Sequence, residues 1–434
     1  MTRWILLTLV VAWSDCAGAA EPPAAVQDYS YIWPGFLGAG CGATDERTLP
    51  LEWHESQHVA WRVKLPGRGQ SEAIVWQDHV YATSVTDEPS LVLTCLARGD
   101  GTVRWRKAWS TEARIRLGEN FANAASTPAC DSQGIYAAFE SGDIVALTHD
   151  GHERWRRSLT RDYGEWKIES GWASSLAQDE SLVFALVDHE NGSYLAALRK
   201  DTGHTEWRVE RAAHKSSWSS PVLANIGGAM QLVVSSCGSV DGYDPTSGRL
   251  CWRFGELAGN TAPSARVCGA GVFLVGANIE NPRFDASRAW HSNMAIRVTY
   301  ERGVWQVHEQ WRSVTGPTFY ATPLAHRGAA YWIDRRGFLS CLSTDEGTVH
   351  YTERLGETSW ASPIAVGGRV YVFGRKGTTW VLKSGAEFEV LSTNRLPLTP
   401  DDAPADVQPA VYSASAVHGA LFLRTDSRLT CLSP

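Results

Sequence analysis

Five aromatic residues stand just before runs of small residues, and they are the side chains of this sequence best suited to bind a ligand. They are Trp172, Trp218, Tyr320, Trp360 and Tyr412, and Asn123 occupies a similar place in one more repeat. Rings that converge on one opening can stack on a planar ligand or hold a peptide. The alternative is that they only fill the interior, because aromatic residues in cores outnumber those in binding sites.

Motifs that would support catalysis are missing from the sequence. There is no G-x-S-x-G turn for a nucleophilic serine and no H-E-x-x-H motif for zinc. His54 and His58 are four residues apart, but their segment has the pattern of a loop and a strand rather than a helix. The stretch GENFAN, residues 118–123, offers oxygen ligands without a complete metal site. We therefore predict no catalytic residues, no metal site and no enzymatic activity.

The composition is that of a globular protein with a large core. Hydrophobic residues make up 44% and charged residues 20% of the 434 positions. The formal net charge is −7, without the basic patch that nucleic-acid binding requires. We therefore predict no nucleic-acid partner.

The N-terminus has the pattern of a secretory signal. Arg3 precedes an apolar run, and the small residues 17–20 provide an A-x-A-like cleavage site. We expect a signal peptide at residues 1–20, a leader segment at 21–50, and export to the periplasm or the extracellular space without a transmembrane helix in the mature chain. Asp15 stands just before Cys16, which argues against a lipid anchor.

The cysteines do not form the pattern of a disulfide scaffold. Three of them occupy matching small-Cys-Leu phrases and are expected to be buried strand residues, too far apart to pair: Cys95, Cys341 and Cys431. The remaining ones could include a disulfide, with the pairing left open: Cys41, Cys130, Cys237, Cys251 and Cys268.

One phrase recurs along the chain, a turn with a glycine four residues before an aromatic. Examples are RGDGTVRW ending at Trp105, THDGHERW at Trp155, KDTGHTEW at Trp207 and DPTSGRLCW at Trp252. The glycine can adopt the left-handed conformation that closes a bulged hairpin. Around the phrase, short β-branched segments alternate without helical periodicity, which predicts an all-β protein in which the phrase is a structural turn.

The landmarks divide the chain into eight units of four strands, with the fourth strand ending near the aromatic. The units begin near residues 71, 126, 174, 219, 262, 321, 361 and 413, and the fifth carries an insertion around 280–293. The last unit stops at LTCLSP without a fourth strand, whereas HVAWRVKL at 58–65 is a fourth strand without the preceding three. We therefore predict an eight-bladed β-propeller over residues 51–434, closed by the N-terminal strand.

These features resemble the family of PQQ-like (quinoprotein alcohol dehydrogenase-like) eight-bladed propellers, whose docking phrase is roughly A-x-D-x-x-T-G-x-x-x-W. The leader WPGF at 33–36, the stretch 49–71, the stretch 123–147 and the phrase EFEVLSTNRL at 387–396 resemble the exported BamB-like branch. The quinoprotein dehydrogenases of this fold would need an adjacent cysteine pair, and the chain has no Cys-Cys dipeptide. We therefore expect no cofactor, with PQQ as the group that the resemblance would imply.

Two functions from different classes fit these observations. The first is a non-catalytic exported scaffold that binds a protein or peptide partner, with envelope or outer-membrane protein assembly as the process that we would expect it to serve. The second is a propeller that binds a small ligand or a PQQ-type cofactor at the mouth of its channel, as a degenerate quinoprotein. In either case we expect Trp172, Trp218 and Trp360 to share one face within one concave site.

Overall fold

A computed structural model describes residues 29–434, except 41, 45–48, 89, 114, 119, 258, 260, 261, 278–290, 404 and 406. The predicted signal peptide, Cys41, Glu119 and most of the insertion in the fifth unit therefore lie outside the described residues. Among the described residues, no helix has the length and apolar character that a membrane crossing needs.

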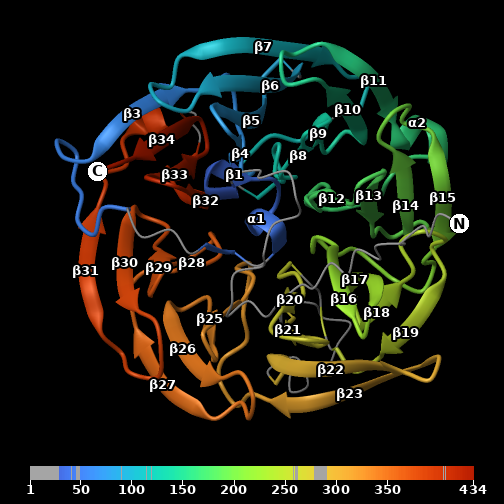
Figure 1. The fold of residues 1–434 in the computed structure, drawn as a ribbon. Helices are drawn as coiled ribbons and strands as arrows, with labels where there is room; N and C mark the ends of the chain where they lie inside the picture. Colours follow the sequence, from blue (N-terminus) through green and yellow to red (C-terminus); the bar gives the residue numbers. More distant parts are fainter. Residues whose placement is uncertain are drawn as a thin grey trace, which may run out of the picture.

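Eight sheets surround a central axis, and the strands of each sheet follow one another from the axis to the rim (Figure 1). Blades 1 to 4 consist of β4 (Ile74–Trp76), β5 (His79–Val85), β6 (Ser90–Ala97) and β7 (Val103–Ser110); β8 (Ala129–Asp131), β9 (Gly134–Ala138), β10 (Asp143–Leu147) and β11 (Glu153–Ser158); β12 (Ala177–Gln178), β13 (Leu182–Val187), β14 (Tyr194–Arg199) and β15 (Thr205–Glu210); and β16 (Val222–Ile226), β17 (Ala229–Ser236), β18 (Ser239–Tyr243) and β19 (Leu250–Phe254).

Blades 5 to 8 repeat this order and complete the ring. They consist of β20 (Arg266–Val267), β21 (Val272–Val275), β22 (Met294–Glu301) and β23 (Val304–Arg312); β24 (Leu324–His326), β25 (Ala329–Ile333), β26 (Phe338–Ser343) and β27 (Val349–Arg354); β28 (Ile364–Val366), β29 (Arg369–Phe373), β30 (Thr378–Lys383) and β31 (Val390–Arg395); and β32 (Val411–Val417), β33 (Ala420–Thr425), β34 (Arg428–Leu432) and β3 (Val59–Lys64). The N-terminal strand β3 pairs antiparallel with β34, which confirms the predicted closure.

The outer strands extend further than the sequence predicted. The fourth strand of each unit was expected to end near its aromatic residue, but Trp105 is the third residue of β7, which continues to Ser110. The strand continues because residues 106–110 keep pairing with β6. Trp155, Trp207 and Trp252 are likewise the third residues of their strands, whereas Trp311 stands next to the end of β23.

The repeated phrase joins neighbouring blades. Five outer-strand tryptophans donate their Nε1–H to a carbonyl in the turn of the next blade: Trp61 to Arg98 O (2.9 Å), Trp105 to His149 O (3.0 Å), Trp155 to Lys200 O (2.9 Å), Trp207 to Pro245 O (2.9 Å) and Trp311 to Thr344 O (2.8 Å). Gly248 has φ +70°, and a Cβ atom there would lie 2.6 Å from Trp207 Cε3. The phrase therefore needs glycine both for its turn and for the approach of the indole ring.

A second set of contacts, here called the hydroxyl belt, runs around the ring where the inner strands begin. In each contact a backbone N–H donates to a Ser or Thr hydroxyl of the next blade: Glu72 to Thr127 (3.1 Å), Thr127 to Ser175 (2.9 Å), Ser175 to Ser220 (2.9 Å), Ser220 to Ser264 (2.8 Å), Ser264 to Thr322 (3.0 Å) and Thr322 to Ser362 (2.9 Å). Between blades 8 and 1 the hydroxyls of Ser413 and Ser415 donate to the carbonyls of Ser71 and Ala73 instead. The belt explains why these positions carry hydroxyl side chains as well as being small.

Part of the predicted leader lies inside the ring. It contains the 3-10 turn η1 (Tyr29–Tyr31), β1 (Ile32–Trp33), the short helix α1 (Leu37–Gly40) and β2 (Ala43–Thr44). β1 pairs antiparallel with β4 of blade 1, and β2 pairs parallel with β28 of blade 7, so both sheets gain a fifth strand. Figure 1 shows α1 at the centre of the ring.

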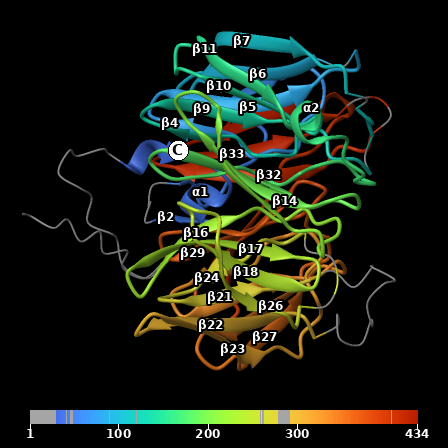
Figure 2. The ribbon, with the colours of Figure 1, turned by 90° about the vertical axis from the view of Figure 1, so that its right-hand side faces the viewer.

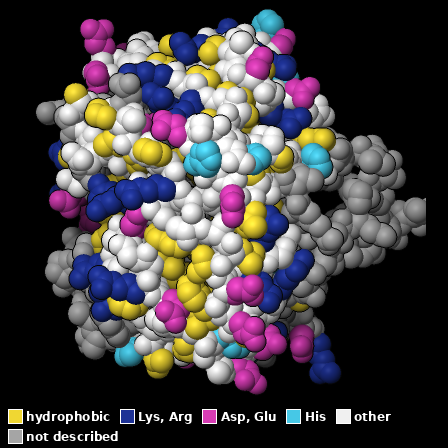
Figure 3. All heavy atoms as spheres, turned by 90° about the vertical axis from the view of Figure 1, so that its left-hand side faces the viewer, with side chains coloured by type: hydrophobic (Ala, Val, Ile, Leu, Met, Phe, Trp, Pro, Cys, Tyr) yellow, Lys and Arg dark blue, Asp and Glu magenta, His cyan; other side chains and the backbone are white. Residues whose placement is uncertain are grey.

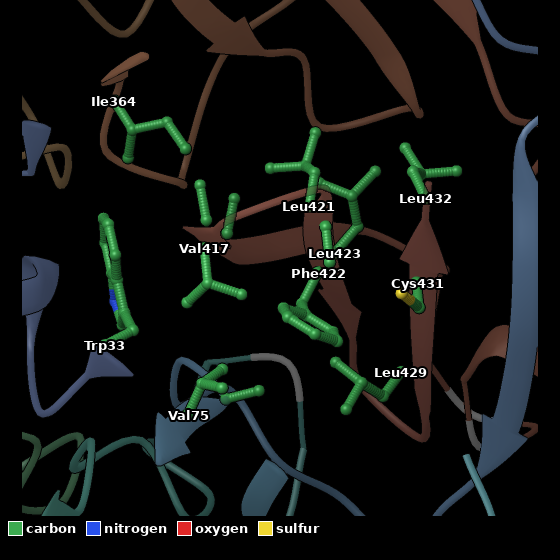
Figure 4. Packing of buried hydrophobic residues seen from close by; sticks show 14 of the residues in the cluster. Trp33, Val75, Ile364, Val417, Leu421, Phe422, Leu423, Leu429, Cys431 and Leu432 are labelled. Carbon is green, nitrogen blue, oxygen red and sulfur yellow. The ribbon is translucent and has the colours of Figure 1, made fainter. Parts of the chain in front are cut away.

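The leader contributes to the largest hydrophobic cluster. Trp33 is buried beside Val75 of β4, Val417 of β32 and Ile364 of β28, the inner strands of three neighbouring blades (Figure 4). Its indole Nε1–H donates to the carboxyl of Glu72 at 2.9 Å. The leader is therefore held both by apolar burial and by a buried polar contact.

No disulfide joins two cysteines of the described residues. Cys130, Cys251 and Cys268, for which a disulfide was left open, are free thiols, as are those in the small-Cys-Leu phrases. Burial raises the pKa of the Cys95 and Cys431 thiols to about 12, so these side chains remain protonated and behave as small apolar residues.

Candidate functional site

A cleft with a volume of about 1480 Å³ lies over blades 1 to 3. Its walls are the connection from β7 to β8, the connection from β11 to β12 and the turn between β9 and β10. The second connection begins with the short helix α2 (Leu159–Tyr163), whose first turn is capped by the Ser158 hydroxyl. Figure 2 shows α2 toward one face of the ring and α1 toward the other. The cleft therefore lies away from the side on which the leader is placed.

Two of the predicted aromatic residues line this cleft. Trp218 is half-buried and donates its Nε1–H to Gly171 O at 2.9 Å, so it reaches back toward the preceding blade. Trp172 is 1% exposed and donates to Leu186 O of its own blade at 2.7 Å. The ring of Trp166 meets Trp172 edge-on at 5.1 Å and is more exposed to the cleft.

Asn123 is buried and shapes the cleft rather than lining it. Its Nδ2 donates to Arg116 O at 2.8 Å, and its Oδ1 accepts from the Gly118 N–H at 3.1 Å. The amide thus fixes the loop that carries Phe121, which does line the cleft. The next residue, Ala124, has φ +42°, a backbone conformation that non-glycine residues rarely adopt.

The other three predicted aromatics form an arc over blades 6 to 8 and are not among the residues that line the cleft. The rings of Tyr320 and Trp360 are 6.0 Å apart and nearly perpendicular, and the rings of Trp360 and Tyr412 are 5.1 Å apart. The guanidinium of Arg375 lies 3.9 Å from the centre of the Trp360 ring. Tyr320 is 46% exposed. The expectation that Trp172, Trp218 and Trp360 share one concave site is thus not met by this cleft.

The hydroxyl belt shows how Trp172 differs from the other predicted aromatic residues. Trp218, Tyr320 and Trp360 each stand two residues before the belt position of their blade. Trp172 stands three residues before Ser175, because the phrase WASS has one residue more than WSS. Asn123 stands four residues before Thr127. A shift of one residue turns a side chain to the other side of the chain, which fits the burial of Trp172.

Carboxyl groups form much of the cleft wall formed by blade 2. Asp143 Oδ2 accepts hydrogen bonds from the hydroxyls of Ser141 (2.7 Å) and Thr111 (2.9 Å). Glu140 accepts the N–H of Ala124 at 3.0 Å, and burial raises the pKa of Glu140 to about 7. Nothing in the sequence marked Glu140, Phe121 or Trp166 as cleft residues, because they lie in loops outside the repeated phrases.

The cofactor that the resemblance would imply does not fit the central channel. Trp33 and Leu37 of the leader are each 2% exposed there, and Glu72 accepts hydrogen bonds from both of them, at 2.9 Å and 2.8 Å. On the opposite side of the channel, the buried Arg266 guanidinium donates to Gly40 O at 2.6 Å. A planar quinone on the axis would have to displace this packed segment. Within the described ranges, no three His, Cys, Asp or Glu residues gather as a metal site would require.

Comparisons with known proteins agree with this architecture. A family model described as outer membrane protein assembly factor BamB matches residues 43–186 and 165–262, which together span just over half of the chain. No curated protein matches by sequence.

Solved structures share the fold at low sequence identity. BamB from Moraxella catarrhalis is 12% identical with a TM-score of 0.59, over 87% of this chain and 99% of that one. Quinohemoprotein alcohol dehydrogenase from Comamonas testosteroni is 11% identical with a TM-score of 0.59, over 93% of this chain and 80% of that one. A europium-containing methanol dehydrogenase is 11% identical with a TM-score of 0.52, over 92% and 91% of the two chains. With the family match over residues 43–262, these results show that the chain belongs to the PQQ-like eight-bladed propeller family of BamB.

Proposed function

We propose that this protein is a non-catalytic scaffold of the cell envelope that binds an extended segment of a partner polypeptide in the cleft over blades 1 to 3. The observation that carries the proposal is the combination of a channel filled by the leader and a separate cleft of about 1480 Å³ whose lining includes no leader residue. Pockets for small ligands usually measure about 300–1,000 Å³, so the cleft is large enough for several residues of a peptide.

The lining of the cleft suits a peptide. Indole and phenyl rings of Trp218, Trp166 and Phe121 offer apolar contact area, and the carboxyls of Glu140 and Asp143 offer acceptors for backbone and side-chain donors. The envelope location rests on the signal-like N-terminus and on the family description, which names outer membrane protein assembly. The dehydrogenase-like alternative would place its ligand in the channel, where the leader lies.

A peptide-display experiment tests the proposal. A random dodecapeptide library is selected on the immobilised mature chain, and the recovered peptides are titrated against the wild type, Trp218→Ala and Tyr320→Ala. Loss of the Trp218 side chain should weaken binding about tenfold or more, as expected for a central aromatic contact. Tyr320→Ala is the matched control because Tyr320 belongs to the arc outside the cleft. Melting temperatures check that both variants are folded.

Three outcomes contradict the proposal. The library yields no binding peptide, or Trp218→Ala binds as the wild type does, or Tyr320→Ala is the damaging variant, which would move the site to the arc. Native mass spectrometry of gently purified protein is a second, independent test of the proposal. A stoichiometric small molecule would favour a ligand-binding propeller, whereas mass of the bare chain is consistent with a scaffold.

A further inference from the structure

The outer strands of blades 1 and 2 carry an unusual concentration of positive charge. The exposed basic residues are Arg104, Arg106 and Lys107 on β7 and Arg154 and Arg156 on β11. These five residues are here called the basic rim. The chain as a whole has a net charge of −7, so this concentration is local and opposite in sign to the average.

The two strands lie next to one another on the outside of the ring. The indole of Trp105 on β7 donates to His149 O in the turn before β11 at 3.0 Å. The indole of Trp109, near the other end of β7, donates to Glu153 Oε2 on β11 at 2.6 Å. Figure 2 shows β7 and β11 side by side along one edge of the molecule. The basic rim is therefore one continuous surface rather than two separate ones.

Among the described residues, no side chain of the basic rim forms an ion pair with a carboxylate, although Asp100 interacts electrostatically with Arg104. Arg104 contacts the ring of His79, Arg106 donates to the Thr94 hydroxyl and Arg154 donates to Gln133 O, all of which are uncharged or basic partners. The carboxyl of Glu153, on the same strand as Arg154, accepts a hydrogen bond from Trp109 and is one acidic group against the five basic groups of the rim. Because the basic groups outnumber the neighbouring acidic ones, their field extends into solvent and favours a polyanion.

The outer strands of two other blades differ. The outer strands of blades 3 and 6 mix the two signs, with Glu206, Arg208 and Glu210 on β15 and Glu353 and Arg354 on β27. Figure 3, which looks onto the side formed by blades 7 and 8, shows acidic and basic side chains interspersed with hydrophobic ones. The positive surface therefore has a defined position on the ring.

We propose that the basic rim docks the propeller onto the anionic headgroups of a phospholipid membrane. The surface consists of two β-strands with long cationic side chains and, apart from the 45% exposed Val103, without exposed large hydrophobic residues that could anchor a protein partner. Such a diffuse surface suits headgroups, each basic residue near an anionic bilayer contributing about 1 kcal/mol. Docking by this edge leaves both faces of the ring open to a partner, although Arg156 of the rim also lines the cleft.

Vesicle binding tests this inference separately from the peptide experiment. The mature chain is sedimented with vesicles of phosphatidylcholine containing 30 mol% phosphatidylglycerol and with pure phosphatidylcholine vesicles, in about 50 mM and 300 mM salt. The test variant is Arg106→Gln, Lys107→Gln and Arg154→Gln, none of which lines the cleft. The control variant removes the same charge from exposed arginines of blades 5 and 6, with Arg302→Gln, Arg327→Gln and Arg354→Gln.

The expected result is binding to the anionic vesicles that falls at least about tenfold in the test variant and in high salt, and by less than about threefold in the control variant. Pure phosphatidylcholine should not bind. The inference is overturned if anionic vesicles do not bind at low salt, or if the two variants lose binding equally. It is also overturned if poly-L-glutamate binds the wild type at a concentration where vesicles do not, which would identify an acidic polypeptide as the partner.

Discussion

Replacing Glu72 by glutamine should remove a pH dependence from the stability of the channel. Burial raises the pKa of Glu72 from its ordinary value of 4.5 to about 8, although Trp33, Leu37 and the nearby Arg266 act in the opposite direction. The folded protein therefore holds this proton more tightly than the unfolded chain does. The resulting stabilisation is complete below pH 4.5 and is lost as the pH rises through about 8. At roughly 1.4 kcal/mol for each pKa unit, the loss by pH 8 amounts to roughly 4 kcal/mol.

Glutamine fits the same contacts without an ionisable group. Both leader N–H groups donate to one oxygen of Glu72, Oε2, and the amide oxygen of glutamine can accept both. Urea unfolding between pH 5 and pH 8 measures the effect, and hydrogen exchange of the 29–44 segment reports release of the leader. The wild type should lose stability over this range relative to Glu72→Gln, while the exposed Glu52→Gln variant should follow the wild type. Parallel profiles for the wild type and Glu72→Gln would refute the reasoning.

Three further predictions concern the ring itself. Ser220→Ala removes one acceptor of the hydroxyl belt and should lower the free energy of unfolding by about 1 to 3 kcal/mol, measured by urea denaturation, because a buried N–H loses its partner; an unchanged midpoint would show that the belt does not contribute. Gly248→Ala should cost roughly 2 to 4 kcal/mol in the same assay, since it combines a positive φ with a Cβ contact of 2.6 Å to Trp207. Gly228 has φ +86° but open space around it, so Gly228→Ala should lower the free energy of unfolding only by the cost of the backbone conformation. Equal losses in Gly228→Ala and Gly248→Ala would contradict the role of Gly248 in the contact between blades. Deletion of residues 51–65 should abolish soluble folded protein because it removes β3 and exposes the edge of β34, so a deletion variant with an unchanged cooperative melt would contradict the closure.

The repeated turn allowed the fold to be predicted from the sequence. Glycine four residues before tryptophan has a local physical reason, a left-handed turn, and a nonlocal one, the approach of the preceding blade's indole ring. Both constraints act on the same few positions in most blades, so they leave a periodic pattern. The incomplete units at the two ends of the sequence predicted in the same way how the ring closes, and β3 pairs with β34 as expected.

The residues of the cleft, of the channel and of the basic rim follow no repeated pattern in the sequence. Trp172 and Trp218 stand in similar phrases, but an extra residue before Ser175 changes the direction of the Trp172 side chain, and only the hydrogen-bond register reveals it. Glu72 is a single carboxyl at the start of a strand, and its partners Trp33 and Leu37 are more than thirty residues away. The basic rim was invisible in the net charge, because the charges that balance it lie on other blades.

The hydroxyl belt has a direction, since each blade from the second to the sixth offers an N–H to the blade that follows and a hydroxyl to the one before. Blades 2 to 6 thus present the same pair of surfaces, so a tandem duplication of one of these units would bring compatible surfaces on both of its sides. The direction is interrupted between blades 8 and 1, where Ser413 and Ser415 donate to carbonyls instead. Changes in blade number during the evolution of this family are therefore compatible with the interior of the ring, whereas this junction has to be matched anew to the curvature of each ring size.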